Sequence, residues 1–129
     1  MDRTIYQKRL LVIAALWNWA VTGVFFTLSV AMPSAFVTLG FVIPNSMLWF
    51  HCSIGIVGVF GVAYMVASRD PKANRGLLMV CVVEKFFFFL VFTIYFFIGD
   101  VSIVGLLVVV VDLAFGILFL EVVLRTRKQ

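Results

Sequence analysis

The basic residues of this 129-residue chain are grouped rather than spread along it. Nine of the ten Lys and Arg residues lie in three clusters, Arg3/Lys8/Arg9, Arg69/Lys72/Arg75 and Arg125/Arg127/Lys128, and the stretches between the clusters are almost wholly apolar. Cytoplasmic loops of membrane proteins carry an excess of Lys and Arg, so each apolar stretch has to leave the cytoplasm and return. The pattern therefore predicts an all-α, integral membrane four-helix bundle with both termini cytoplasmic.

The composition indicates the same class of protein. Hydrophobic residues make up 64% of the chain and charged residues 12%, which is more apolar surface than a water-soluble fold of this length can bury. The net charge of +4 would also suit nucleic acid. We instead expect a lipid bilayer as the partner and no nucleic acid, because anionic head groups attract basic clusters at helix ends. The expected location is a cell inner membrane or plasma membrane, with several crossings.

The apolar stretches predict helices over residues 10–31, 47–67, 72–98 and 102–124, within one transmembrane domain that covers residues 1–129. Residues 34–46 carry no charge and are too few to span the bilayer, so we expect them to lie in the interface or dip into it. In the basic turn we expect Asp70 to cap free backbone N–H groups and Pro71 to begin the third helix.

The second and third predicted helices differ in side-chain bulk. Gly55, Gly58 and Gly61 remove bulk from the second helix, so we expect a packing surface there that another helix approaches closely. The third helix contains the run Phe86–Phe89 and further aromatic residues on all sides. Some of these rings have to face lipid or a partner subunit.

Charged side chains inside a bilayer need a physical explanation, because each costs roughly 2.5–3.5 kcal/mol on insertion scales. Counted from the cytoplasmic helix ends, Lys85 lies about 13 Å deep and Asp112 about 18 Å deep. Their helices are antiparallel neighbours, so we predict a buried Lys85–Asp112 ion pair. Asn18 reaches about the same depth as Lys85 in the first helix, which indicates an intramembrane polar layer.

Glu84 belongs to the same layer but points elsewhere. Consecutive helical residues lie about 100° apart, so Glu84 should face Asn18 or the second helix rather than share the direction of Lys85. Without a cation beside it, burial favours its neutral form. The layer has two interpretations: interhelical contacts that fix how the helices pair, or a ligand or proton site at Glu84.

The remaining reactive side chains do not form a motif. Cys52 and Cys81 are predicted near opposite faces of the membrane, so they cannot pair within one chain. His51 stands beside Cys52 with no further ligands in view, so no metal site is predicted. The histidine is expected at the outer interface, and a redox or haem role is the alternative. Glu121 is expected to pair with Arg125, four residues on. No catalytic residue is indicated, and the sequence leaves the cofactor unknown.

The stretches Gly61–Tyr64, Ala67–Pro71 and Asn74–Leu77, followed by Lys85 and by Asp112–Phe115, resemble small bacterial four-helix membrane proteins of a loosely DoxX-like type. The resemblance covers the second half of the chain, and its most distinctive part is the Arg-Asp-Pro turn together with the Lys and Asp of the last two helices. Some DoxX-type proteins are linked to quinone-dependent sulfur oxidation. The resemblance would therefore imply a subunit of a quinone-linked redox complex.

These observations lead us to expect a small polytopic membrane protein that acts as a structural or accessory subunit, in a homo-oligomer or a larger membrane complex. Two alternatives stay open. One is a proton-coupled small-molecule carrier that uses Glu84, although small multidrug transporters of similar size carry their essential Glu in the first helix, where this chain has no acid. The other is the DoxX-like redox subunit.

Overall fold

The computed structural model describes residues 3–126, and helices account for most of them. They are α1 (Arg3–Ala31), α2 (Pro33–Thr38), α3 (Met47–Arg69), α4 (Arg75–Ile98) and α5 (Ile103–Thr126). All except α2 are long and apolar enough to cross a membrane. A helix of 24 residues such as α5 is ~36 Å long, which exceeds the ~30 Å hydrocarbon core of a bilayer. The described chain thus has the predicted all-helical, four-span architecture of a multi-pass membrane protein.

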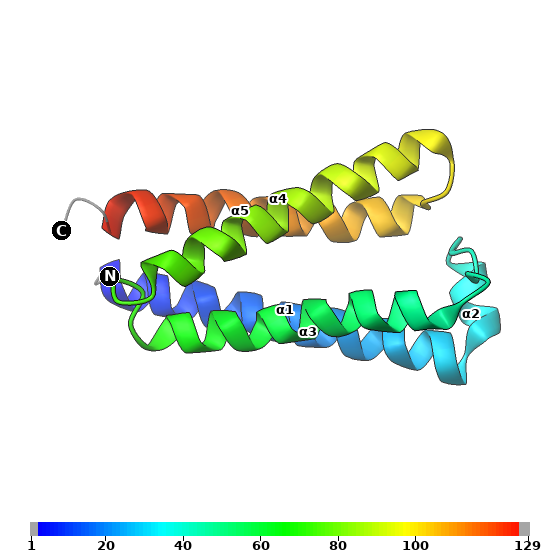
Figure 1. Cartoon of the computed structure of the whole chain (residues 1–129), viewed down its shortest axis with the longest axis horizontal. Helices are drawn as coiled ribbons and strands as arrows, with labels where there is room; N and C mark the ends of the chain where they lie inside the picture. Colours follow the sequence, from blue (N-terminus) through cyan, green and yellow to red (C-terminus); the bar gives the residue numbers. More distant parts are fainter. Residues whose placement is uncertain (1–2, 127–129) are drawn as a thin grey trace.

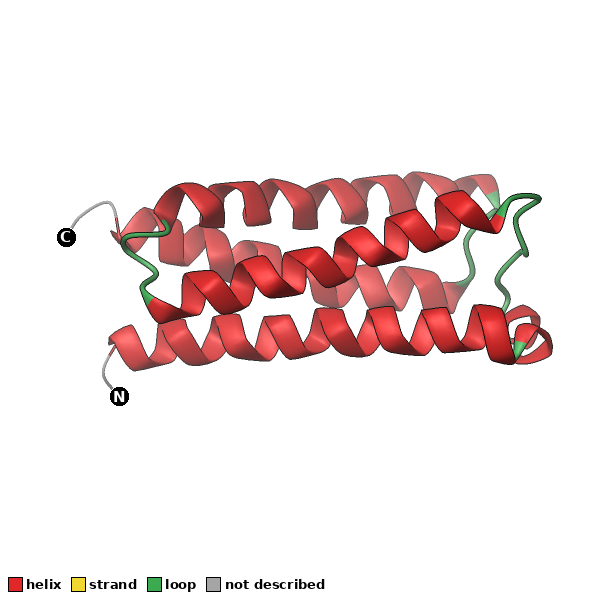
Figure 2. Cartoon of the chain, turned by 60° about the horizontal axis from the view of Figure 1, so that its bottom comes forward, coloured by secondary structure: helices red, strands yellow, loops and turns green. Residues whose placement is uncertain are grey.

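The four long helices form two antiparallel hairpins, α1 with α3 and α4 with α5 (Figure 1). The start of α1, the end of α5 and the α3–α4 turn lie at the same end of the bundle, as predicted (Figures 1 and 2). We call it the basic end, because it carries Lys8, Arg9, Arg69, Lys72, Arg75 and Arg125. Arg127 and Lys128, the rest of the third predicted cluster, lie outside the described residues. The far end holds α2 and the turn between α4 and α5.

Two predicted helix starts differ in the structure. The first helix was predicted from residue 10, but α1 begins at Arg3, because the prediction counted only the apolar stretch and the charged residues before it continue the same helix. The second difference lies in the turn between α3 and α4. Asp70 caps backbone groups as expected, because its Oδ1 accepts hydrogen bonds from the backbone N–H groups of Lys72 (3.1 Å) and Ala73 (3.0 Å). The start of the third long helix at residue 72 is wrong, however, since residues 71–74 form a turn and α4 begins at Arg75. The physical reason is that the Asp70 carboxylate holds the amides of this turn, so the regular helix starts only after it.

At the far end, residues 32–46 form a connection that folds back onto the bundle. It contains the short helix α2, which the sequence did not predict, with Pro33 in its first turn. Phe36 is buried, and the Phe41 ring stacks on it with 5.0 Å between centroids. Phe41 also meets Phe25 of α1 edge-on at 5.1 Å. These aromatic contacts attach the connection to the α1–α3 hairpin.

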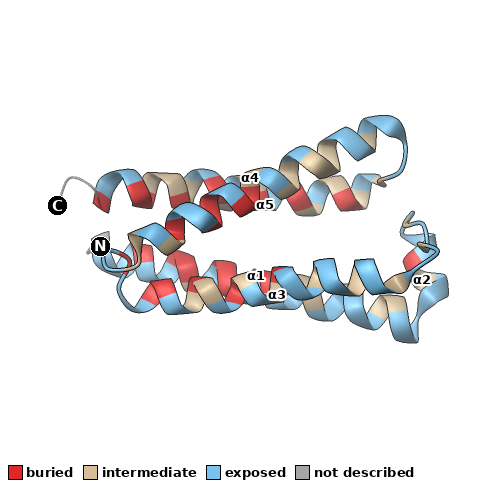
Figure 3. Ribbon diagram, viewed as in Figure 1, coloured by how far each residue is buried: buried red, intermediate tan, exposed pale blue. Residues whose placement is uncertain are grey.

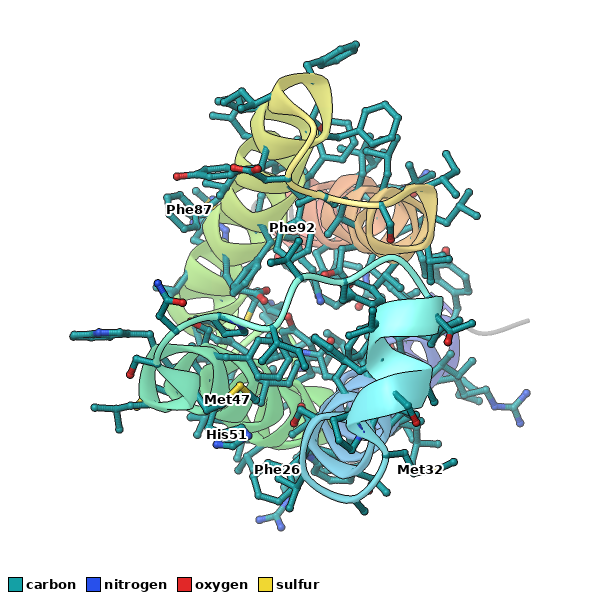
Figure 4. The ribbon with its side chains drawn as sticks, turned by 90° about the vertical axis from the view of Figure 1, so that its right-hand side faces the viewer. Phe26, Met32, Met47, His51, Phe87 and Phe92 are labelled. Carbon is teal, nitrogen blue, oxygen red and sulfur yellow. The ribbon has the colours of Figure 1, made fainter. Side chains whose placement is uncertain are left out.

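The same connection touches the α4–α5 hairpin. Gly40 has a left-handed backbone (φ 81°), and a Cβ added to it would lie 2.8 Å from the Cβ of Ser102. The Phe41 ring lies 3.3 Å from the place that a Cβ on Gly105 would occupy. Viewed from the far end, the connection passes over the region between the hairpins, while Phe87 of α4 points away from it (Figure 4). The far ends of the two hairpins are therefore linked through Gly40 and Phe41.

The closest packing lies in the half of the bundle nearer the basic end (Figure 3). The core there includes fully buried side chains from all four long helices, among them Leu11, Tyr64, Leu78 and Phe119. Beyond Lys85, α4 has no buried residue in its remaining length to Ile98. The two hairpins therefore pack tightly against each other in only one half of their length.

Candidate functional site

Lys85 lies at the centre of a polar layer where the packed half of the bundle ends. Its side chain is completely buried, and its Nζ donates a hydrogen bond to Asp112 Oδ1 of α5 at 2.7 Å. A second bond goes to Asn18 Oδ1 of α1 at 2.8 Å. The Lys85–Asp112 ion pair predicted from helix depth is thus present. The single ammonium group joins three of the four long helices.

The partners of Lys85 are themselves held in place. Trp17 Nε1 donates to the same Asp112 oxygen at 3.2 Å, and Asn18 Nδ2 donates to the Val57 carbonyl of α3 at 2.9 Å. Charged hydrogen-bonding groups buried in a membrane are stable only when such partners surround them. The contacts of Trp17 and Asn18 therefore fix the position of α1 relative to both α3 and α5.

Glu84 faces α3, which is one of the two directions expected for it. Tyr64 donates a hydrogen bond to Glu84 Oε2 at 2.5 Å. The other oxygen, Oε1, has no hydrogen-bond partner among residues 3–126 and lies 3.8 Å from Lys85 Nζ. Lys85 also lies over the Tyr64 ring, 5.4 Å from its centroid. One buried cation is therefore close to two carboxylates, but it is bonded to only one of them.

The structure brings all four predicted members of the layer together and closes them off from the surface. Lys85 and Asn18 are 0% exposed, and Glu84 and Asp112 are each 6% exposed. Sequence reasoning did not assign two residues that donate hydrogen bonds to the layer, Trp17 and Tyr64. Trp17 could have been found from its position beside Asn18. Nothing in the sequence marks Tyr64 as the partner of Glu84, because its hydroxyl is an ordinary polar group in an otherwise apolar helix.

The predicted glycine surface is confirmed at two of its three positions. A Cβ on Gly61 would lie 2.5 Å from Trp19 Nε1, and a Cβ on Gly58 would lie 3.3 Å from the side chain of Thr22. Gly55 is exposed with nothing within 4 Å of its Cβ position, so it takes no part in helix packing within the described chain. A step of three residues falls about 60° short of a full turn, so Gly55 faces about 120° away from Gly61.

Close approach at these glycines is accompanied by hydrogen bonds from side chains of α1 to backbone carbonyls of α3. Trp19 Nε1 donates to the Gly58 carbonyl at 3.1 Å, and Thr22 Oγ1 donates to the Ile54 carbonyl at 3.1 Å. With the Asn18 bond, these contacts hold the α1–α3 hairpin along its middle section. Small residues and interhelical hydrogen bonds are the usual means of helix association in lipid.

The other candidate side chains lie apart from the layer. Cys52 is exposed in the far half of α3, and Cys81 is buried in the packed half of α4. His51 lies beside Phe26 (Figure 4), and its Nε2 is 3.2 Å from Ser29 Oγ. Glu121 pairs with Arg125 as predicted, at 2.5 Å on the surface. Within residues 3–126, no three His, Cys, Asp or Glu side chains are grouped to hold a metal.

Comparisons with known proteins add no family to this description. No protein-family model matches the chain, no curated protein matches it, and no solved structure matches its fold. The fold and the polar layer define a multi-pass membrane protein whose two hairpins are joined by hydrogen bonds around a buried ion pair, which itself lies within the α4–α5 hairpin. The DoxX-like resemblance, with the redox role that it implies, stays a prediction.

Proposed function

We propose that the chain is a structural or accessory membrane subunit, and that its polar layer determines how the two hairpins pair. The observation that carries this proposal is the position of Lys85, which bonds from α4 to both α1 and α5 in a closed layer. A buried charge network specifies one pairing because any other arrangement leaves a charge or hydrogen-bonding group without a partner. The layer thus acts through position rather than through chemistry on a substrate.

The outer surface suits this role. Phe87 and Phe97 of α4 are 59% and 82% exposed, so large rings are available to lipid, to a partner subunit or to a second copy of the chain. The basic end supports a location in a cell inner membrane or plasma membrane with that end in the cytoplasm, because Lys and Arg are retained on the cytoplasmic side.

A proton-coupled carrier is the second candidate, and the free oxygen of Glu84 favours it. Lys85 can neutralise one carboxylate, and at 2.7 Å it is committed to Asp112. The layer is electrically balanced when Glu84 holds a proton. A carrier would bind and release that proton, whereas a structural layer would keep it.

Infrared titration of the purified protein separates the two candidates without knowledge of a substrate. A structural layer predicts that the buried carboxyl band of wild-type protein stays constant between about pH 5 and 8, the range in which unperturbed groups of this kind change little. It also predicts that Glu84→Gln lowers stability. A band that titrates in this range, disappears in Glu84→Gln and persists in the surface control Glu121→Gln would overturn the structural proposal in favour of the carrier.

A further inference from the structure

The two hairpins are joined differently in the two halves of the bundle. In the half nearer the basic end they share one core, and three hydrogen bonds of the polar layer run between them. Toward the far end, α1 has no buried residue beyond Asn18, α3 has none before Val57 and α4 has none beyond Lys85. Within residues 3–126, no hydrogen bond, ion pair or ring contact runs directly from α1 or α3 to α4 or α5 in this far half. Side-chain contacts between the long helices therefore hold the hairpins together mainly at the basic end.

In the far half, the link between the hairpins is the connection of residues 32–46, which is attached firmly to the α1–α3 hairpin. The buried Phe36 ring meets Phe50 of α3 edge-on at 5.4 Å. The Phe41 ring meets Phe25 of α1 edge-on at 5.1 Å, and the Phe41 N–H donates to the Phe36 carbonyl at 3.3 Å. We therefore expect the connection to move together with the α1–α3 hairpin.

The contact of the connection with the α4–α5 hairpin is small and contains no hydrogen bond within the described chain. Gly40 lies against the Ser102 side chain, and the Phe41 ring lies against Gly105, where no side chain stands in its way. The Ser102 hydroxyl is engaged within its own hairpin, since its Oγ accepts the Gly105 N–H at 3.4 Å. Van der Waals attraction falls by up to about half when a gap of about 1 Å opens between two atoms. This contact is therefore the easier of the two attachments to separate.

We propose that Gly40 and Phe41 form a latch that closes the far end of the bundle, and that release of this latch lets the two hairpins move apart there. The polar layer and the core beside it remain in place and act as the pivot. Rotation of packed units about an interface is a common form of conformational change. The proposal concerns the motion of the hairpins and holds whether Glu84 keeps or exchanges a proton.

The expected size of the motion follows from the position of the polar layer. From Lys85 to Ile98, the last residue of α4, the helix rises about 20 Å. A rotation of about 15° about the layer, as in other rigid-body transitions, would shift the end of α4 by about 5 Å. A shift of this size can be measured between two spin labels, one on each hairpin.

The test is double electron–electron resonance on the full chain in lipid nanodiscs, which measures the distance between two spin labels. Cys81→Ala leaves Cys52 of α3 as the only cysteine, and Ile98→Cys adds a second label site at the far end of α4. These two sites are the far label pair. A second pair reports the basic end and uses Val66→Cys and Met79→Cys, which replace exposed residues of α3 and α4, after both native cysteines are removed.

Phe41→Ala should lengthen the distance of the far label pair by about 5 Å and leave the basic-end pair unchanged. Gly105→Val acts from the other side of the contact, because its side chain would occupy the place where the Phe41 ring lies, and it should produce the same shift. The matched control Phe87→Ala removes the same ring from a position that points away from the connection, so both distances should stay as in the wild type (Figure 4).

An unchanged distance of the far label pair in Phe41→Ala or in Gly105→Val would overturn the proposal. Lengthening of both label pairs would also overturn it, because it would show general loosening of the bundle rather than rotation about the layer. The two substitutions act from opposite sides of the contact, so one folded variant is enough to decide.

Discussion

Removing one member of the Lys85–Asp112 pair should destabilise the protein more than removing both. Lys85 is completely buried, and its Nζ lies 2.7 Å from Asp112 Oδ1. Loss of one partner of a buried pair costs about 3–5 kcal/mol of unfolding free energy, and Lys85→Met should be near the upper value because it leaves Asp112 with no cation nearby. Asp112→Leu should be near the lower value, since Lys85 still lies 3.8 Å from Glu84 Oε1 and can pair with it.

The double variant Lys85→Met/Asp112→Leu removes both charges together. It also loses the bonds from Lys85 to Asn18 and from Trp17 to Asp112, and interhelical hydrogen bonds of this kind contribute roughly 0.6–1.7 kcal/mol each. The expected loss is about 1–3 kcal/mol, compared with about 8 kcal/mol for the sum of the two single variants. The pair should therefore show a coupling energy of about 5–7 kcal/mol, far above the deviation of about 0.5 kcal/mol found for independent sites.

The measurement is unfolding by dodecyl sulfate in mixed micelles, followed by circular dichroism in the helical region. Glu121 and Arg125 provide the matched control, because they form an ion pair that is 40% and 54% exposed. Their single and double Gln variants should give a coupling of only about 0.3–0.5 kcal/mol. If the Lys85 and Asp112 variants add within about 0.5 kcal/mol, the two residues do not act as a pair and the reasoning fails.

Three further predictions concern helix contacts, and each is read from the same unfolding measurement. Gly61→Ala should lower the unfolding free energy by about 1–3 kcal/mol, because its Cβ would displace an indole ring of α1. Gly55→Ala has open space around it, so its unfolding free energy should stay the same or rise by up to about 1 kcal/mol. Losses of equal size in the two variants would contradict the close approach at Gly61. Gly40→Ala should lower the unfolding free energy more than Gly99→Ala does. Both glycines have a left-handed backbone, which costs an alanine about 1–2 kcal/mol, but only an alanine at position 40 would also clash with the α4–α5 turn. Tyr64→Phe should lower the unfolding free energy by about 1–3 kcal/mol, because it leaves a buried oxygen of Glu84 without its hydrogen-bond donor. It should also shift the infrared carboxyl band of Glu84. An unchanged band and an unchanged unfolding midpoint would rule out this hydrogen bond.

The sequence was sufficient to predict the features that depend on position along the membrane normal. Four crossings follow from three basic clusters and the apolar lengths between them, and the structure confirms the common end of the two helix termini and the α3–α4 turn. The Lys85–Asp112 pair was predictable for the same reason. Depth is counted as ~1.5 Å per residue from a helix end, so antiparallel neighbours can be aligned without knowing their rotation.

Rotation about each helix axis was decided only by the tertiary structure. The long helices are apolar around most of their circumference, so the residue pattern does not mark which face is inside. For that reason the sequence could not select Tyr64 as the partner of Glu84, and it could not show that Gly61 faces α1 whereas Gly55 faces outward.

The return of Phe41 onto the bundle likewise comes from packing of aromatic rings that are distant in the chain. Composition and charge order thus determined how often the chain crosses the membrane and at which end its helices start and stop. Which side chains meet between the helices was decided by packing, because contacts depend on helix rotation and on close fit, and neither is encoded in hydrophobicity alone.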